Sequence, residues 1–538
     1  MSSGVRVRVA EDGDVEGIRD VFLAVYGADY PYESFFDRAW LRRSVHTDDI
    51  IMLVADDPET GAVLGSASVV LDVGAHSDLV GEMGRLVVHP DHRGRGVGRA
   101  LMKGRLDQVR DRLHLAMVEN RCVHSFSQRI SRANGFAPVG FLPMKHTLEG
   151  RESVALYVRL FDAARVLRRN HPRVIPEAAA LAEGALRSCG VEPDVVVDDS
   201  TRAWPPSPDG TFVAEALTSV GYPALLRVER GRVRNREIFG PMRLQYGFFK
   251  LTTRHADYLV ARGAAGPDRG PGPLAGAVGF IHDDHEQTVR IFELIPLQDA
   301  AARFLLGTLL ERARAWGVAY VEVDVSAHAP RMQRTLLELG FTPAAYVPSG
   351  VFWDVERLDV VKMVRLLVPL KTGPLELVDE ARHVAAPVLR ALSERQVLPR
   401  LAEALRTIGV FRGLDEEQAT RVASACGLAR FETGEALFEA RSDADRLFLL
   451  LEGAVEVRLP GAAAPAGHVT AGEPLGERAL LTGQHHSARA TATSPVEAAV
   501  LHRDDLRAVE RQRPDIGLVL YRNLAIGLGR KLARSNTP

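Results

Sequence analysis

A short stretch rich in glycine and arginine stands between an apolar strand and an expected helix. The strand is predicted over residues 80–88, Pro90 ends it, and a helix is predicted to begin near Val97. Between them the chain reads Arg93-Gly94-Arg95-Gly96-Val97-Gly98-Arg99-Ala100. Backbone N–H groups at a helix start, flanked by arginines, suit a multiply charged phosphate, and glycines let the backbone approach it closely. This stretch therefore predicts a site for a nucleotide-like cofactor.

The glycine spacing excludes two common phosphate sites. A dinucleotide fingerprint needs its third glycine where this chain has Arg99, and no Gly-Lys-Ser/Thr follows to make a P-loop. The motif Arg93-x-x-Gly96-x-Gly98 after Val88-His-Pro90 instead resembles the pyrophosphate loop of the GNAT superfamily of acetyl-CoA-dependent N-acetyltransferases. The resemblance implies acetyl-CoA as co-substrate. The N–H groups of residues 94–100 would hold the pyrophosphate, and Val87 or Val88 would offer an N–H to the thioester oxygen. The alternative is a glycine-rich turn with solvated arginines.

The acceptor side of such a site needs a base, and Glu82 is the candidate. It lies eleven residues before Arg93, the offset at which several members of the resembled family carry a glutamate base. A carboxylate in the cleft between the sheet halves would have its pKa raised by desolvation. The alternative is a solvated glutamate at a strand start. The family builds its acceptor pocket where this chain has Tyr26, Tyr30 and Tyr32, although core packing explains these tyrosines equally well.

The acid that protonates the leaving thiolate departs from the family pattern. Many members carry a tyrosine four residues before a Gly-Phe pair, and here Ser131 takes that position before Gly135-Phe136. A serine hydroxyl forms hydrogen bonds but is a weak acid. Ser131 is therefore the candidate, with water or His124 as alternatives, and His124 reads equally as a helix-start residue.

The last 130 or so residues follow a different pattern, in which short strands alternate with turn residues between helical ends. With Gly434-Glu435, residues 447–453 and residues 472–481, this pattern resembles the cyclic nucleotide-binding domain, a small jelly roll. The resemblance implies a cassette in which the glutamate of Gly476-Glu477 takes the ribose 2′-OH. An arginine nine residues after the glutamate would pair with the cyclic phosphate.

The expected arginine is missing from this cassette. His486, followed by Ser487, stands in its position, and Arg489 comes three residues late. On a strand an odd offset points a side chain to the opposite face, so Arg489 substitutes only if a bulge intervenes. A histidine lacks the bidentate fork of arginine. Two interpretations follow: a site for a cyclic nucleotide effector such as cAMP, or a degenerate regulatory or dimerisation domain.

The elements along the chain predict three folded domains. The order of helix 299–316, strand 319–325, a further helix and Gly340-Phe341 repeats that of the first 162 residues, but residues 296–303 contain no glycine. The predicted fold class is an α/β (α+β) GNAT fold in two copies, followed by an all-β jelly-roll domain with flanking helices. The predicted parts are a catalytic GNAT domain (1–162), a helical and Pro-rich connector (163–210), a degenerate GNAT-like domain (211–370), a helical linker (371–405) and a cyclic-nucleotide-binding-like domain (406–538).

Composition narrows the class of protein. The net charge of −2 gives no general field for nucleic acid or an anionic membrane, and no apolar run is long enough to span a bilayer. The three cysteines and the pair His485-His486 lack metal-ligand spacing, so no metal and no disulfide is predicted. The first residues enter a strand directly, without a signal peptide. A cytoplasmic bacterial protein is expected.

These observations favour an acyl-CoA-dependent N-acyltransferase that uses Glu82 as general base and is modulated by its last domain. Its acceptor would be a primary amine of a protein lysine or of a small molecule, and a homodimer is a candidate assembly. The alternative is a non-catalytic sensor or scaffold that binds acyl-CoA, a cyclic nucleotide or both.

Overall fold

The computed structural model describes all residues except 1–4, 29, 31, 72–78, 149, 219–235, 240–255, 265–271, 372–374, 443–444 and 536–538. The chain forms two compact units, Met1–Arg390 and Ala391–Pro538. The division falls inside the predicted helical linker, within the helix α10 (Asp379–Thr407). Each unit is described by itself below.

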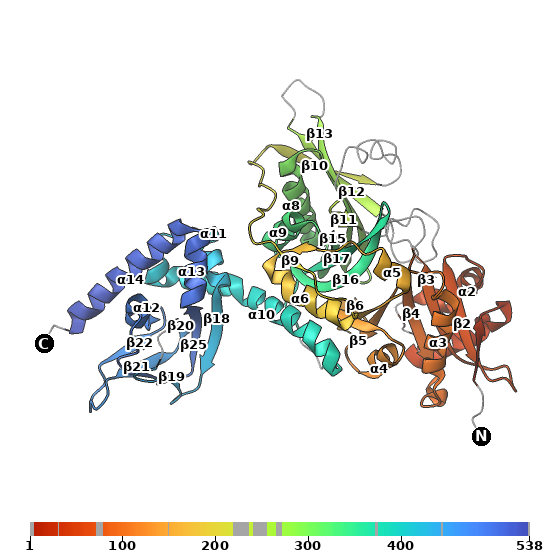
Figure 1. Cartoon of the computed structure of the whole chain (residues 1–538), viewed down its shortest axis with the longest axis horizontal. Coiled ribbons are helices and arrows are strands. Elements are labelled where there is room, and N and C mark those ends of the chain that lie inside the picture. The colour runs from red at the N-terminus through yellow and green to blue at the C-terminus, as the bar shows by residue number, and fades with distance from the viewer. Residues whose placement is uncertain are drawn as a thin grey trace. The chain divides into compact units, whose positions relative to one another are not determined.

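The first half of the larger unit follows the predicted alternation of strands and helices (Figure 1). Its strands run antiparallel except for one parallel pair, β4 and β5. The elements are β1 (Arg6–Val9), α1 (Val15–Tyr26), α2 (Arg38–Val45), β2 (Ile50–Asp56), β3 (Val63–Leu71), β4 (Val80–Val88), α3 (Val97–Val109), β5 (Leu115–Arg121), α4 (Phe126–Ala133), β6 (Ala137–Thr147) and β7 (Arg151–Leu160).

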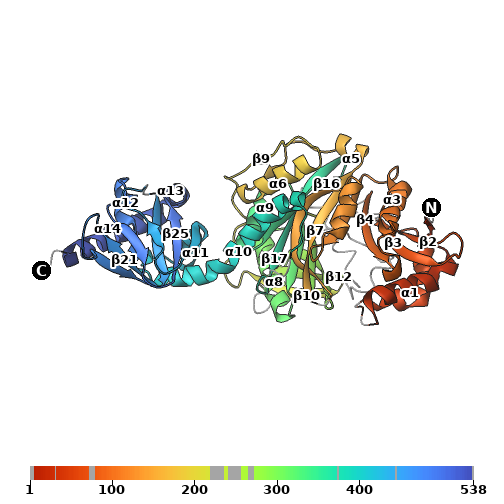
Figure 2. The same cartoon turned by 90° about the horizontal axis from the view of Figure 1, so that it is seen from below.

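Helices cover both faces of these strands, with α1 and α3 on opposite sides (Figure 2). On one face Met52 and Val54 of β2 pack with α1 and α2, and on the other Leu53 and Ala55 pack with α3. Both faces of β2 are therefore apolar, as expected for a strand buried between two layers of helices. Leu101 of α3 is completely buried against the sheet.

The parallel pair β4 and β5 opens into a fork. The strands pair only from Val80 with Leu115 to Glu82 with Met117. Beyond this point β4 continues to Val88 and β5 to Arg121 without pairing to each other. Beyond Glu82 and Met117 the facing backbone groups of these two strands are therefore not paired with each other.

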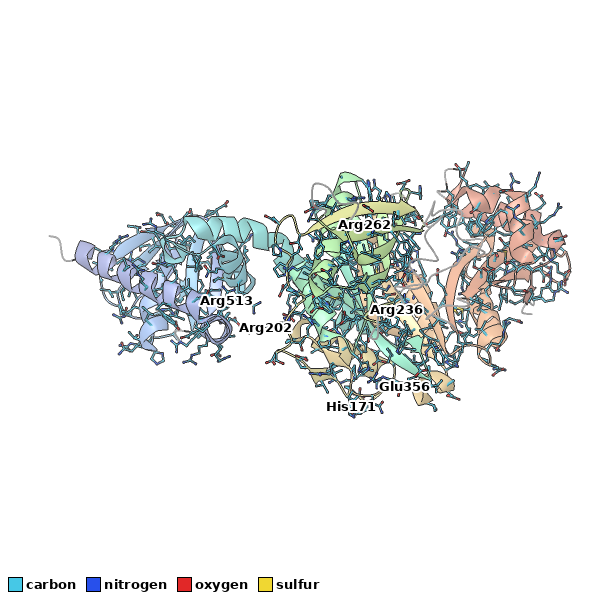
Figure 3. All side chains as sticks on the ribbon, turned by 90° about the horizontal axis from the view of Figure 1, so that it is seen from above. His171, Arg202, Arg236, Arg262, Glu356 and Arg513 are labelled. Atoms are coloured by element: carbon cyan, nitrogen blue, oxygen red, sulfur yellow. The ribbon has the colours of Figure 1, made fainter. Side chains whose placement is uncertain are left out.

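The second half of the larger unit follows a connecting segment that contains α5 (Asp162–Val166), β8 (Arg173–Val174), α6 (Pro176–Ser188) and β9 (Val196–Val197). Arg262, which is labelled in Figure 3, forms an ion pair with Glu215 (3.0 Å) that joins two of its outer strands. Its elements are β10 (Phe212–Thr218), β11 (Ile238–Phe239), β12 (Ala256–Gly263), β13 (Leu274–Asp283), β14 (Thr288–Pro296), α8 (Asp299–Ala315), β15 (Tyr320–Ser326), α9 (Pro330–Glu338), β16 (Thr342–Trp353) and β17 (Glu356–Leu366).

Among the described residues, one mixed sheet of 15 strands runs through both halves, and its order repeats. From one edge inward the order is β1-β2-β3-β4-β5-β7-β6, and from the other edge inward it is β10-β12-β13-β14-β15-β17-β16, with β11 beside β15. In each half one pair is parallel, β4 with β5 and β14 with β15. The halves join where β6 pairs with β16, at Gly140 and Ala345.

The smaller unit contains two four-stranded antiparallel sheets, as predicted for a jelly roll. Their inner faces supply apolar residues such as Phe448, Leu450 and Val455, and the helices pack on Leu447 and Leu449. Its elements after α10 are α11 (Glu416–Ser424), β18 (Cys426–Phe431), β19 (Ala436–Phe438), β20 (Arg446–Glu452), β21 (Ala454–Arg458), β22 (Gly467–Thr470), β23 (Pro474–Leu475), α12 (Glu477–Thr482), β24 (Arg489–Ala492), β25 (Val496–His502), α13 (Arg503–Gln512) and α14 (Pro514–Ser535).

Candidate functional site

The glycine–arginine stretch forms an exposed loop that ends at the start of α3. Gly94 and Gly96 have φ angles of 79° and 81°, the left-handed region that favours glycine. The first bond at the helix start runs from the Ala100 N–H to the Gly96 carbonyl at 3.0 Å. The N–H groups of residues 97–99 therefore have no acceptor within the helix and suit an anion.

Side chains of the loop divide between solvent and core. Arg93, Arg95 and Arg99 are exposed, and Arg95 Nη1 lies 2.9 Å from His92 Nδ1. Val97 is buried with Leu101 between the helix and the sheet. The core thus anchors the helix start while the arginines stay in solvent, the arrangement that the sequence predicts for a phosphate site.

A bulge in β4 lies directly before the loop. The register between β3 and β4 shifts between Ser66 and Ser68, and Arg85 has a φ of 55°. Positive φ at a residue other than glycine costs about 1–3 kcal/mol and persists only where the surroundings hold it. Val87 and Val88, the predicted N–H donors to the thioester oxygen, follow this bulge.

Arg105 lies buried beneath the bulge. It belongs to α3 and is only 1% exposed, and its Nη1 donates to the carbonyls of Gly84 (2.9 Å) and Ser68 (3.2 Å). Burial lowers its pKa, because desolvation disfavours the charged form. Arg105 was not predicted from the sequence as a site residue. Its only signal is a position on the apolar face of the helix, beside Leu101 and Leu106.

Glu82 stands at the vertex of the fork. It pairs in register with Val70 of β3 and with Met117 of β5, the last pair before the strands separate. It is exposed. The structure thus gives Glu82 access to solvent at the fork, and its role as base stays a prediction.

Ser131 lies inside the first half rather than on an open surface. It is completely buried, and its Oγ donates to Asn120 Oδ1 at 3.1 Å. The neighbouring Gln128 of α4, also completely buried, donates to the carbonyl of Glu376 at 2.7 Å. His124 lies at the start of this segment with its ring 5.6 Å from that of Phe126. Ser131 is therefore committed to an internal hydrogen bond, and its role as acid stays a prediction.

The three tyrosines form a single aromatic cluster on the α1 face of the sheet. Tyr26 and Tyr30 stack at 4.3 Å, and the rings of Tyr30 and Tyr32 lie 5.3 Å apart. They pack against the same core cluster as Val87 of β4. The structure thus shows core packing of the three tyrosines, and their role as an acceptor pocket stays a prediction.

A partly buried group of charged residues on β5 and β6 was not predicted from the sequence. Glu119 accepts hydrogen bonds from Lys145 Nζ (2.6 Å) and His146 Nε2 (2.7 Å). Burial raises the pKa of Glu119, but the two cations outweigh it and lower the pKa well below its usual range. Glu119 is thus a carboxylate too acidic for a base. A charged residue inside an apolar strand was the available signal.

The cassette residues of the smaller unit lie together, but their side chains already have partners. Glu477 is 6% exposed at the start of α12, and its Oε1 accepts from Lys531 Nζ at 2.7 Å. Lys531 belongs to α14 and also donates to the carbonyl of Pro474 at 2.7 Å. The candidate ribose carboxylate is therefore paired with the C-terminal helix, a contact for which the sequence carries no signal.

His486 is buried at the position where an arginine was expected. It is 5% exposed and stacks on Phe438 with ring centroids 3.8 Å apart, and its Cε1 lies 3.5 Å from where a Cβ on Gly476 would be. Burial lowers its pKa, which favours the neutral ring. Ser487 is exposed, and Arg489 on β24 lies 3.3 Å from Glu439.

The described residues lack two kinds of feature. They contain no group of three or more His, Cys, Asp or Glu side chains placed to hold a metal ion. None of the described helices is both long and apolar enough to cross a membrane.

Comparison with known families matches two parts of the chain. The acetyltransferase (GNAT) family matches residues 15–129, which include β4, the loop and α3. The cyclic nucleotide-binding domain matches residues 428–513, which include the cassette.

Two curated proteins each match part of this chain. Glutaminase 1 of Bradyrhizobium diazoefficiens is 31% identical over 266 residues, which cover 47% of this chain and 41% of that protein. The CRP-like cAMP-activated global transcriptional regulator of Mycobacterium tuberculosis is 27% identical over 140 residues, covering 25% of this chain and 59% of the regulator. This chain thus spans less than two thirds of either relative.

Solved structures of similar proteins cover about a quarter of the chain. A putative cyclic nucleotide-binding protein from Geobacter metallireducens is 31% identical, with a TM-score of 0.23, and covers 24% of this chain and 97% of its own. The N-terminal domain of a transcriptional regulator from Streptomyces coelicolor is 28% identical, with a TM-score of 0.22. The match covers 25% of this chain and 94% of that structure.

Proposed function

Because the chain carries a GNAT acetyltransferase domain and a C-terminal cyclic nucleotide-binding domain, we propose that it is an acyl-CoA-dependent N-acyltransferase with a regulatory C-terminal unit. One observation carries the proposal: the Arg93–Ala100 segment, with its arginines exposed, leads into the start of α3, and the strand before it, β4, separates from β5 after Glu82. Phosphate groups of the co-substrate and its thioester thus find adjacent partners on one strand–loop–helix segment.

The chemistry follows from the residues at the fork. The N–H groups at the start of α3, with Arg93, Arg95 and Arg99, hold the pyrophosphate. Backbone N–H at Val87 or Val88 stabilises the charge that develops on the thioester oxygen. Glu82 removes a proton from the acceptor amine, whose nitrogen then bonds to the carbonyl carbon while the C–S bond breaks. The thiolate takes a proton from water, His124 or Ser131.

The acceptor approaches from the face of the sheet opposite α3. Val87 points to the α1 face with the three tyrosines, whereas Leu86 and Val88 point to the α3 face. A primary amine, on a protein lysine or a small molecule, is the substrate that this chemistry requires. Acetyl is the acyl group we propose, and a cytoplasmic location in a bacterium is consistent with the composition.

The second half of the larger unit is a second, degenerate GNAT-like domain. Three features support this, beginning with the repeated strand order. Met144 and Ser349 occupy matching places on β6 and β16, both with positive φ (50° and 54°). Arg159 and Arg365 donate to the carbonyls that precede Gly135 and Gly340.

The second copy has lost the loop. In the first half the His89 N–H bonds to the Leu64 carbonyl and Val97 follows eight residues later. In the second half Leu297 makes the matching bond to Ala275, and Ala301 follows only four residues later. Leu101 and Leu305 contact the matching glycines Gly65 and Gly276, which fixes the alignment. The shorter connection lacks both the glycines and the arginines of a phosphate site.

The C-terminal unit regulates the enzyme, and cAMP is its candidate effector. Glu477 would take the ribose hydroxyl after Lys531 leaves, and buried His486 with exposed Ser487 would face the cyclic phosphate. Pairing of two chains through this unit is the candidate homodimer. The five-part division at residues 162, 210, 370 and 405 remains our proposed domain organisation.

One observation favours a second candidate function, an acyl-CoA sensor without turnover. Ser131 is buried and bonded to Asn120 where many members of the family carry an acidic tyrosine. The two functions differ in turnover but not in co-substrate binding.

Thiol release from acetyl-CoA over a panel of amines tests the proposal. We expect turnover by the wild-type chain and a fall of about 100-fold or more in kcat for Glu82→Gln, the usual scale for losing a general base. Calorimetry should show unchanged acetyl-CoA affinity in this variant. If wild type binds acetyl-CoA but turns over no amine, the sensor function replaces the enzyme.

A further inference from the structure

Glu286 is a buried carboxylate on the turn between β13 and β14 of the second half. It is 7% exposed, although its neighbour Asp284 on the same turn is largely exposed. The turn is held by Asp283, whose Oδ1 accepts from the N–H groups of His285 and Glu286, both at 3.0 Å. A carboxylate is buried at a cost unless its oxygens are satisfied, so the partners of Glu286 define its role.

Among the described residues, the groups that bond to the side chain of Glu286 all belong to the first half. Tyr32 Oη donates to Oε1, and the Thr147 N–H donates to Oε2 at 2.7 Å. His146 Nδ1 lies 3.5 Å from Oε1. Arg151 Nη1 donates to the Glu286 carbonyl at 2.8 Å. The turn thus joins two segments of the first half, the tyrosine segment after α1 and the end of β6.

These contacts continue into the fork. His146 bonds through Nε2 to Glu119, which lies on β5 beyond Met117, where β5 has left β4. Burial would lower the pKa of His146, but its bonds to Glu119 and Glu286 raise it to about 9. At neutral pH the ring is therefore a cation between two carboxylates, which fixes its orientation.

On its other side Glu286 fixes the tyrosine cluster. Tyr32 contacts Tyr30, and Tyr30 stacks on Tyr26. The ring of His285 adds an edge contact to Tyr32 at 5.9 Å. The cluster packs with Val87, the strand residue next to the proposed thioester position. Whatever holds Tyr32 in place therefore shapes the wall that an acceptor amine meets.

We propose that Glu286 is a positioning residue for the acceptor, so that the second half completes the acceptor side of the acyl-transfer site in the first. This inference rests on the proposed function. The degenerate half supplies no phosphate loop of its own, yet it provides the carboxylate that holds Tyr32 against the fork. Its binding role is thus directed at the amine and not at the acyl-CoA.

Steady-state kinetics on the full chain test this inference. In Glu286→Gln the size is kept but the charged acceptor for Tyr32 and His146 is lost. We expect KM for the acceptor to rise about tenfold, while KM for acetyl-CoA stays within about twofold of wild type. Tyr32→Phe, which removes only the hydroxyl, should raise the same KM by a smaller factor. Asp284→Asn on the same turn is the matched control and should leave both constants unchanged.

The outcomes separate this inference from the function on which it rests. No turnover by wild type with any amine overturns the proposed function itself. Turnover with an unchanged acceptor KM in both variants overturns the role of Glu286. Equal rises in both KM values, together with a lower unfolding temperature, would show a purely structural contact and overturn it too. If Glu286→Gln does not fold, Tyr32→Phe decides alone.

Discussion

Arg105 shows how one side chain supports the proposed chemistry from outside the site. Its guanidinium spans the carbonyls of Ser68 and Gly84, on the two strands whose register shifts at the bulge. The alignment through Leu101 and Leu305 places Leu309 at the matching point of the second half, where it is fully buried. At this matching point a buried cation is present only in the half with the proposed phosphate loop. We therefore interpret Arg105 as the residue that stabilises the bulge and so fixes the position of the N–H groups after it.

Arg105→Met should reduce turnover more than stability. Methionine fills a similar volume and removes a desolvated charge, which offsets the loss of the two hydrogen bonds to backbone carbonyls. The bulge, however, loses the hydrogen bonds from Arg105, so the N–H of Val87 or Val88 that is proposed to stabilise the thioester oxygen should be misplaced. We expect kcat to fall about tenfold, or about 1.4 kcal/mol in activation free energy. Thiol-release kinetics and thermal unfolding measure the two effects.

Lys103→Met provides the control on the same helix, because Lys103 is exposed. It should leave kcat and the unfolding temperature unchanged. A kcat of Arg105→Met equal to wild type would show that the bulge holds its shape without the guanidinium.

At the scale of elements, the sequence predicted what is local. The bounds of β4 and the first residue of α3 agree with prediction, because alternation, proline and glycine mark these places directly. The Arg93–Ala100 loop was recognised for the same reason. The partners of Glu477, Glu119 and Tyr32 were not, because they come from elements 54, 26 and 254 residues away. Neither composition nor period reports which distant helix end or turn meets a given carboxylate.

The end of α14 contacts the proposed cassette through the ion pair of Lys531 with Glu477. For a nucleotide ribose to use Glu477, Lys531 must leave it, and the ion pair therefore competes with the ligand. In Lys531→Met we expect cAMP to bind the full chain about tenfold more tightly than it binds wild type, or about 1.4 kcal/mol. Isothermal titration calorimetry measures the difference.

Arg530→Met is the matched control, since Arg530 is the exposed neighbour on the same helix. It should bind cAMP as wild type does. If Lys531→Met gains no affinity over wild type, the ion pair does not compete with the nucleotide, and the histidine at position 486 becomes the reason for weak binding.

At the scale of the larger unit, the two halves meet at matching residues. Gly140 on β6 pairs with Ala345 on β16, and the matching pair Met144 and Ser349 lies four residues further along each strand. A contact between equivalent positions is what a two-fold relation produces, as in an isologous dimer. The same relation explains why one sheet continues through both halves. It also brings the turn with Glu286 to the first half, so the proposed acceptor site depends on the pairing of β6 with β16.

Gly140→Ala tests the pairing of β6 with β16 directly. A Cβ at this position would lie 2.1 Å from Ala345 Cβ and 2.5 Å from the Ala344 carbonyl oxygen, and a backbone atom cannot rotate away. Overpacking of this kind costs about 1–3 kcal/mol, so we expect a clear fall in the unfolding temperature. Because the halves must separate slightly, the acceptor KM should rise with it, whereas Glu286→Gln should change the KM with little effect on stability. Gly150→Ala, at the turn of the same β6–β7 hairpin with open space around it, should change neither. If Gly140→Ala and Gly150→Ala unfold at the same temperature, β6 and β16 can move apart without loss of stability. Contact between the two halves would then be too weak for the second half to position an acceptor.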